Sequence, residues 1–259
     1  MRCRTPPIVP LFVPVDDDGI WDDGGIGRMR QKGADMAQEM TAATWRIEDD
    51  GTLIVGVADG CEKGVIVFGT ETDEDGREWN AAPWDERADE ITAVRIEEGV
   101  CIQGDMSNIF AGCFDLKSAD VANLDTSAAT RMDCAFYGCD FEAIDVSSWD
   151  VSNVVSMDSM FESCESLKAI DLSGWNTASV RNVSWLFSYC FALEEADVSG
   201  WDTANVTAAD GMFNHCSSLT KVNAAGWDTS NVTNAEVAFL KCGKLEEVVG
   251  IGGWVEAKE

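Results

Sequence analysis

The stretch from Leu167 to Cys190 reads LKAIDLSGWNTASVRNVSWLFSYC, and variants of it fill most of the chain. Tryptophan recurs at positions 149, 175, 201 and 227, and cysteine at 113, 139, 164, 190, 216 and 242, so the period is 25 or 26 residues. Self-similarity at a fixed period of this length is typical of stacked-repeat proteins. Counting first positions from Ile91 to Leu245 predicts seven copies, the last of which ends at Trp254.

Each copy contains two hydrophobic patterns. In the first half, Ile170 and Leu172 alternate with polar neighbours, which predicts a short strand with one buried face. In the second half, apolar residues follow the spacing of one helix face, as in Met157, Met160, Phe161 and Cys164. One strand and one short helix cannot bury both of their faces alone. We therefore expect the copies to stack into an α/β repeat solenoid with a parallel strand ladder along one side.

The first ninety residues differ from the repeats. Residues 1–43 hold four of the five prolines and a run of aspartates at 16–18, which predicts a flexible leader. From Trp45, two alternating runs are joined by Asp50 and Gly51, a strong hairpin signal. We interpret residues 44–90 as a small β-hairpin cap, residues 91–254 as the solenoid and residues 255–259 as a tail.

The composition argues against several classes of protein. The 259 residues include 18 Lys and Arg against 47 Asp and Glu, for a net charge of −29. Such a surface repels phosphate backbones and anionic membranes, so we expect no nucleic-acid partner. No apolar run reaches the roughly 18 residues of a membrane span. Prolines also interrupt the apolar stretch within residues 1–15, which therefore does not predict a signal peptide.

The aligned copies share the pattern Leu-x-x-Ile-Asp-Leu-Ser-x-Trp-Asp-Thr-x-Asn-Val-Thr, followed by Met-Phe-x-x-Cys. This pattern, and the lead-in WRIEDDGTL that starts at Trp45, resemble the BspA-type leucine-rich-repeat surface proteins of bacteria. The resemblance covers roughly residues 44–254. It implies a right-handed leucine-rich-repeat-type solenoid that is secreted or exposed at the cell surface. Adhesion or host-protein binding is the usual role suggested for such proteins.

The periodic cysteines and tryptophans are assigned to the core. Cysteine metal sites typically contain close Cys-x-x-Cys pairs, and the sequence has none. We therefore predict buried free thiols, no metal and no cofactor. Leu124 replaces the tryptophan in one copy, which favours a core role for this position over a ligand platform. The single histidine, His215, is expected on the surface of a short helix and argues against His-dependent catalysis.

Three functions are compatible with this sequence. The favoured one is a non-enzymatic binding or adhesion module that presents a repeated surface to a protein or glycan. The alternative is a structural spacer, or a phage- or fibre-associated solenoid segment. A hydrolase within the first 90 residues is least favoured, because no nucleophile elbow, phosphate loop or separate carboxylate pair is present.

The candidate binding residues lie between the two buried positions of each strand and are expected to face outward. After Arg95 in the first copy they are Asp120, Asp145, Asp171, Asp197 and Asn223. Carboxylates about 5 Å apart repel one another even through water. Two interpretations stay open. Either Ser147, Ser173 and Ser199 satisfy the neighbouring aspartates by hydrogen bonds, or the strip docks a basic partner or divalent cations.

Overall fold

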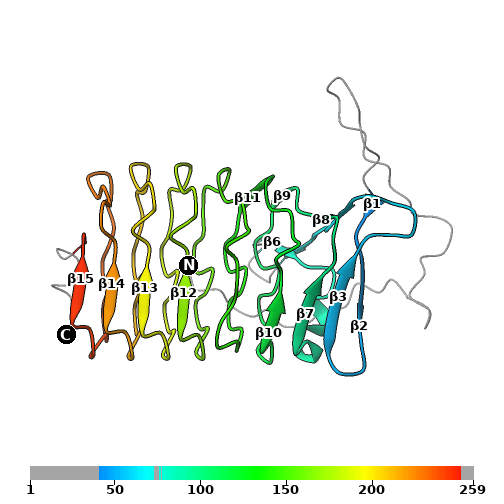
Figure 1. Cartoon of the computed structure of the whole chain (residues 1–259), viewed down its shortest axis with the longest axis horizontal. Coiled ribbons are helices and arrows are strands. Elements are labelled where there is room, and N and C mark those ends of the chain that lie inside the picture. Colours follow the sequence, from blue (N-terminus) through cyan, green and yellow to red (C-terminus); the bar gives the residue numbers. More distant parts are fainter. Residues whose placement is uncertain (1–40, 73–75, 77, 252–259) are drawn as a thin grey trace, which may run out of the picture.

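The computed structural model describes residues 41–72, 76 and 78–251 of the chain. Over these residues the chain winds into a solenoid of about eight turns with parallel strands, which confirms the repeat architecture (Figure 1). Most of the expected leader, Trp254 and the expected tail lie outside the described residues.

The strand side of the solenoid consists of two four-stranded segments. The first has the order β2-β3-β7-β10, with β2 (Thr44–Ile47) antiparallel to β3 (Thr52–Gly56), and β7 (Ala93–Ile96) and β10 (Ser118–Asp120) continuing in parallel. The second is parallel throughout and contains β12 (Ala169–Asp171), β13 (Glu195–Asp197), β14 (Lys221–Asn223) and β15 (Glu247–Val249). Equivalent residues of successive copies lie directly opposite each other, as Asp171 and Asp197 do.

The expected strand ladder is interrupted between β10 and β12, because residues 143–145 form no strand. The corner before them is one residue shorter than the others. Cys139 and Phe141 are two positions apart, whereas Cys164 and Leu167 are three apart. The shorter corner thus coincides with the break in the ladder.

The solenoid begins earlier than the sequence suggested. β3 pairs in parallel with β7, Leu53 opposite Val94, so the first turn starts near residue 52 rather than 91. On another side of the same turn, β4 (Gly64–Val65) pairs in parallel with β1 (Thr41–Ala42) and with β8 (Val100–Cys101). The expected count of seven turns is therefore one too few. The expected cap at residues 44–90 is not confirmed, because β3 and β4 within it belong to this first turn, and β1 lies within the expected leader at residues 1–43.

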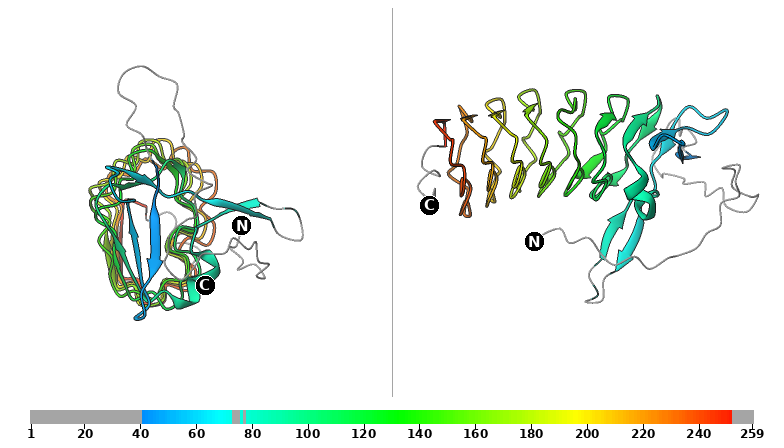
Figure 2. Two further views of the ribbon diagram at one scale, coloured as in Figure 1. Left: turned by 90° about the vertical axis from the view of Figure 1, so that its right-hand side faces the viewer. Right: turned by 90° about the horizontal axis from the view of Figure 1, so that it is seen from below.

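A hairpin leaves the stack within this first turn. β5 (Gly69–Thr72) and β6 (Glu78–Ala81) are antiparallel and project sideways from the solenoid (Figure 2). The 3₁₀ helix η1 (Asp85–Glu90) follows. It is the one helical element of the described residues, so the expected α/β class is not confirmed.

The second half of each copy forms tight turns instead of the expected short helix. Ser159 donates its backbone N–H to the carbonyl of Ser184 (2.9 Å) in the next turn of the solenoid, and Ser163 donates to Ser188 (2.8 Å). Both donors have left-handed φ values, 56° and 61°. Two such residues four positions apart fold the chain tightly enough to bury positions i, i+3, i+4 and i+7 without a helix. We call these stacked segments the turn ladder and their outward side chains the turn face.

Further parallel pairs join the strand side to the turn ladder. β9 (Gly104–Asp105) pairs with β11 (Ala129–Arg131), and single bridges continue this column through Arg131, Ser156, Asn182, Ala208 and Asn234.

The core consists of columns of identical side chains, as predicted. Consecutive phenylalanine rings stack 5.4 to 5.7 Å apart from Phe110 through positions 136, 161, 187 and 213 to Phe239. Trp201 is buried between Trp175 (6.4 Å) and Trp227 (5.7 Å), which confirms a core role for the tryptophans. Each of these indoles donates its N–H to a backbone carbonyl of the preceding turn.

The six periodic cysteines are buried free thiols, again as predicted. Cys190 donates its S–H to the carbonyl of Phe161 (3.1 Å), and four others make the equivalent bond. Burial raises the pKa of Cys113 to about 12, so its thiolate is scarce at neutral pH.

Candidate binding surfaces

The predicted acidic residues lie on the outward side of the strand ladder, which we call the strand face. Asp120, Asp171 and Asp197 are exposed on β10, β12 and β13, and Asn223 is half-buried on β14. Asp145 is exposed in the strandless segment between them. The structure thus places the candidate residues in one column, and Arg95 heads it, directly opposite Asp120.

Serine side chains satisfy one oxygen of each central aspartate. Oδ1 of Asp145 accepts hydrogen bonds from the backbone N–H (3.0 Å) and the hydroxyl (2.6 Å) of Ser147. Asp171 and Asp197 repeat this pair of bonds with Ser173 and Ser199. The bonds lower the pKa of each of the three carboxyls, so all three are charged at neutral pH.

One aspartate of the strip also forms a hydrogen bond through its second carboxylate oxygen. Oδ2 of Asp197 accepts from the amide of Asn223 (3.0 Å), so asparagine at this position replaces a repulsion by a bond between turns. The serine bonds account for the local structure of the strip, and its remaining charge faces solvent. Among the described residues, no group of three or more His, Cys, Asp or Glu side chains could hold a metal ion.

Two open hollows lie on the strand face. The first, of about 460 Å³, spans β10 and residues 143–145, and Lys117 and Asp120 contribute to its lining. The second, of about 390 Å³, spans β12 to β14 and is lined by Ala169, Asp171, Asp197, Lys221 and others. Ile144 lines both, so the hollows adjoin where the ladder is interrupted.

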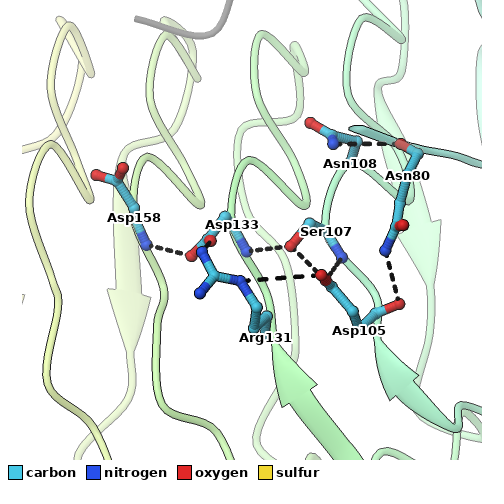
Figure 3. A network of polar contacts seen from close by, with 7 residues as sticks. All are labelled: Asn80, Asp105, Ser107, Asn108, Arg131, Asp133 and Asp158. Atoms are coloured by element: carbon cyan, nitrogen blue, oxygen red, sulfur yellow. Dashed lines mark hydrogen bonds and ion pairs between the residues drawn. The ribbon is translucent and has the colours of Figure 1, made fainter. Parts of the chain in front are cut away.

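A polar network that the sequence did not reveal runs along the other side of the solenoid (Figure 3). Oδ1 of Asp105 accepts from the N–H (2.9 Å) and hydroxyl (2.6 Å) of Ser107. The hydroxyl oxygen of Ser107 accepts from the N–H of Asp133 (3.2 Å), and Oδ1 of Asp133 accepts from the N–H of Asp158 (3.0 Å). Arg131 forms ion pairs with Asp105 and Asp133.

The network ends at Asp158. Oδ1 of this residue is buried and makes no hydrogen bond, because the N–H of Ser184 in the next turn bonds Asn182 instead (2.9 Å). Burial, reinforced by Asp133, raises the pKa of Asp158 to about 6. Asp105, Asp133 and Asp158 can be read from the sequence. The short helix expected for this half of each copy, however, gave no reason to place them in one column along the solenoid.

Aromatic residues occupy the turn face farther along the chain. Tyr189 stacks on His215 (4.6 Å between ring centroids) and meets Phe191 edge-on (5.9 Å). Nδ1 of His215 contacts Oδ1 of Asn214. His215 therefore lies in a tight turn with φ of 61°, not on the expected short helix.

Comparison with known protein families identifies the family to which the repeats belong. The family described as "Mycoplasma protein of unknown function, DUF285" matches residues 104–221 and, in an overlapping second match, residues 171–257. Together these matches cover residues 104–257, more than half of the 259-residue chain. The chain belongs to the DUF285 family. No curated protein matches it.

This DUF285 chain is also similar to solved bacterial leucine-rich-repeat structures. A T. pallidum leucine-rich-repeat protein is 17% identical, with 78% of this chain and 87% of that one covered and a TM-score of 0.40. A leucine-rich cell surface protein from Faecalibacterium prausnitzii A2-165 is 18% identical, with 76% and 56% covered and a TM-score of 0.34. A leucine-rich-repeat protein from Eubacterium ventriosum is 16% identical, with 80% and 82% covered and a TM-score of 0.27. Within the described residues, the DUF285 chain forms no helix long and apolar enough to cross a membrane.

Proposed function

We propose that this chain is a non-enzymatic binding module, secreted or exposed at the cell surface, whose strand face docks a protein or glycan partner. The two adjoining hollows on the strand face carry this proposal. Ligand sites are typically concave surfaces with a few polar groups that fix orientation. Here the inward side chains build the core, and the outward ones vary between copies, as Ala169, Glu195 and Lys221 do.

A matched pair of substitutions tests the docking surface. Ala169→Arg fills the second hollow, whereas Ala204→Arg adds the same side chain at an exposed corner outside both hollows. The purified chain and both variants are screened against a glycan array and a panel of purified extracellular proteins. We expect saturable binding that Ala169→Arg abolishes and Ala204→Arg preserves. Equal binding by both variants contradicts docking on the strand face, and no saturable binding at all favours the spacer.

Within this proposal, the acidic strip steers a basic partner. Oδ1 of Asp145 and Asp171 is occupied by serine, and the side chains are otherwise exposed. Charges at the edge of an interface act mainly on the association rate. We expect Asp145→Asn with Asp171→Asn to slow association about tenfold or less at low salt, with little effect at high salt. A melting temperature raised by millimolar calcium, and only when the aspartates are present, supports cation binding by the strip instead.

A further inference from the structure

Two positions in each copy of the turn ladder have a left-handed backbone, and their side chains belong to the turn face. In the copy that ends at Cys164 these residues are Ser159 (φ 56°) and Ser163 (φ 61°), whereas in the next copy they are Trp185 (φ 56°) and Tyr189 (φ 61°). A left-handed backbone is unfavourable for bulky side chains. Since the fold accepts serine at both positions, it does not require the two aromatic rings. Bulky residues held in such a conformation are typical of functional sites.

The two aromatic rings cover the next turn of the solenoid. A Cβ on Gly211 would lie 2.3 Å from Cε3 and Cζ3 of Trp185, so the indole ring lies against this glycine. Tyr189 stacks on His215 (4.6 Å) and meets the exposed Phe191 edge-on (5.9 Å). We call Trp185, Tyr189, Phe191 and His215 the aromatic platform. Its side chains are half-buried or exposed, so a ligand can reach them from solvent.

Buried oxygens that make no hydrogen bond lie on the same turns as the platform. Among the described residues there are five such side-chain oxygens, and they belong to Ser156, Asp158, Ser159, Ser188 and Asp210. These residues lie on three consecutive turns, and Trp185 and Tyr189 lie on the middle one. Buried polar groups in folded proteins are nearly always hydrogen-bonded. Their concentration here therefore indicates a ligand rich in hydrogen-bond donors.

The hydroxyl of Ser188 is directed toward the platform. Ser188 has no exposed surface and directly precedes Tyr189. Asn214 occupies the same position one turn later, and its Oδ1 contacts Nδ1 of His215 on the turn face. By this equivalence the Ser188 hydroxyl points to the same face, beside the Tyr189 ring. It is placed to bond a ligand that rests on the platform.

Two acidic side chains flank the turn that carries Trp185. Asp158 and Asp210 occupy, one turn before and one turn after, the position that Ser184 holds in this turn. Each has one buried oxygen that makes no hydrogen bond, and the carboxylate of Asp158 points away from Asp133 (Figure 3). Burial, followed by the charge of Glu236, raises the pKa of Asp210. An arriving cation would compensate both carboxylates and supply their missing bonds.

We propose that the turn face around Trp185 binds an arginine-containing segment of a partner protein, with guanidinium groups stacked on the aromatic platform and hydrogen-bonded to Asp158 and Asp210. Arginine supplies five N–H donors in a planar fork that suits carboxylates, and the same plane stacks on aromatic rings. A neutral glycan also stacks on aromatic rings and donates hydrogen bonds, but it leaves the two carboxylates uncompensated. This site is separate from the strand face, so it goes beyond the docking proposed above.

The spacing of the two acids indicates the form of the segment. Asp158 and Asp210 are two turns apart, which is about 10 Å along the solenoid. In a polyproline II segment, every third side chain lies on the same side, about 9 Å from the previous one. Arginines at every third position of an extended segment therefore match the two acids.

The first experiment measures binding of a capped peptide, Arg-Pro-Pro repeated three times, to the full chain by isothermal titration calorimetry. Salt at about 0.15 M screens the general attraction to an acidic chain. We expect Asp158→Asn with Asp210→Asn to weaken binding about tenfold or more. Asp145→Asn with Asp171→Asn on the strand face is the matched control, since it changes the net charge equally, and it should preserve the affinity. Equal losses in the two double variants overturn the proposal, as does the absence of binding by the parent chain.

The second experiment tests the platform. Trp185→Ser and Tyr189→Ser introduce the residue that occupies the same positions one turn earlier, so the backbone conformation is kept. We expect each variant to remain folded by circular dichroism and to bind the peptide about threefold to tenfold more weakly. Unchanged affinity in both folded variants overturns the stacking of guanidinium on the platform.

Two further ligands test the chemistry on the parent chain itself. A peptide with lysine in place of each arginine has the same charge but no planar group to stack, so we expect clearly weaker binding. Equal affinity for the two peptides overturns the choice of arginine. Binding of neutral cellohexaose that Trp185→Ser abolishes and Asp158→Asn with Asp210→Asn preserves also overturns the proposal, in favour of a glycan.

Discussion

Thr203 is a residue whose hydroxyl joins two turns of the solenoid. Its oxygen accepts from the N–H of Asp228 (2.8 Å), and its O–H donates to the carbonyl of the same residue (3.2 Å). The side chain is 2% exposed, so water cannot replace these bonds. Thr126 makes the same two bonds with Asp150, which explains the threonine in the repeated corner.

We predict that Thr203→Val lowers the free energy of unfolding by about 1–3 kcal/mol, because it leaves a buried N–H and carbonyl unpaired. Thr207→Val is the control, since the Thr207 hydroxyl donates to Arg181 (3.2 Å) at an exposed site. The control should stay within about 0.5 kcal/mol of the parent chain in urea melts. Equal losses in the two variants would contradict this role of Thr203.

Asp85, in η1, carries a charge that the fold disfavours. Burial, followed by the charges of Glu71 and Glu86, raises its pKa to about 6. An acid whose pKa is higher in the folded state than in the unfolded state, here 3.8, destabilises the fold at neutral pH. This penalty shrinks as the pH falls through 6 and is absent below about 4.

Asp85→Asn should therefore raise the melting temperature at pH 7 by about 2–4 °C, and by clearly less at pH 4.5. Asp89→Asn, at an exposed site on the same helix, is the matched control and should change little at either pH. A gain for Asp85→Asn that does not depend on pH would show that charge is not the cause.

Substitutions at two glycines test how closely successive turns pack. The two glycines occupy the same place in neighbouring copies. A Cβ on Gly200 would lie 2.0 Å from the carbonyl oxygen of Ser173, whereas a Cβ on Gly174 meets nothing within 4 Å. Gly200→Ala must push two turns apart and should cost about 1–3 kcal/mol. Gly174→Ala should be neutral in the same chemical denaturation, and a similar loss in both would mean that the turns adjust freely.

The phenylalanine column should stabilise the middle of the stack more than its end. Phe187 stacks on Phe161 (5.7 Å) and Phe213 (5.5 Å), whereas Phe239 is the last phenylalanine of the column. We expect Phe187→Ala to cost about 3–5 kcal/mol and Phe239→Ala to cost less, because fewer turns depend on it. Denaturant melts of both variants measure this difference. Equal costs would argue against stability that depends on stacked neighbours.

At the scale of the whole molecule, burial protects the six periodic cysteines from thiol chemistry. Only thiolates react, and burial holds the pKa of these thiols high. In the native chain at pH 8, a chromogenic disulfide reagent should label the half-buried Cys61 quickly and the six periodic cysteines only after denaturant is added. Rapid labelling of the periodic cysteines in the native chain would contradict a closed core.

The sequence by itself determined the repeat, its period and its core. Side chains that recur every 25 or 26 residues can be buried together only by stacking, so the tryptophan, phenylalanine and cysteine columns were predictable. The serine partners of Asp145, Asp171 and Asp197 were also foreseen as one of two alternatives, because a side chain two residues away bonds locally.

Only the tertiary structure decided between the helix and the turn ladder. The spacing of Met157, Met160, Phe161 and Cys164 buries one face in either conformation. A helix would direct each N–H to the carbonyl four residues earlier, but here alternate N–H groups bond the next turn of the solenoid. One copy viewed alone cannot show that choice, since the acceptors lie about 25 residues away. The same dependence on neighbours placed the first turn at β3 and brought Asp133 and Asp158 together on the turn face.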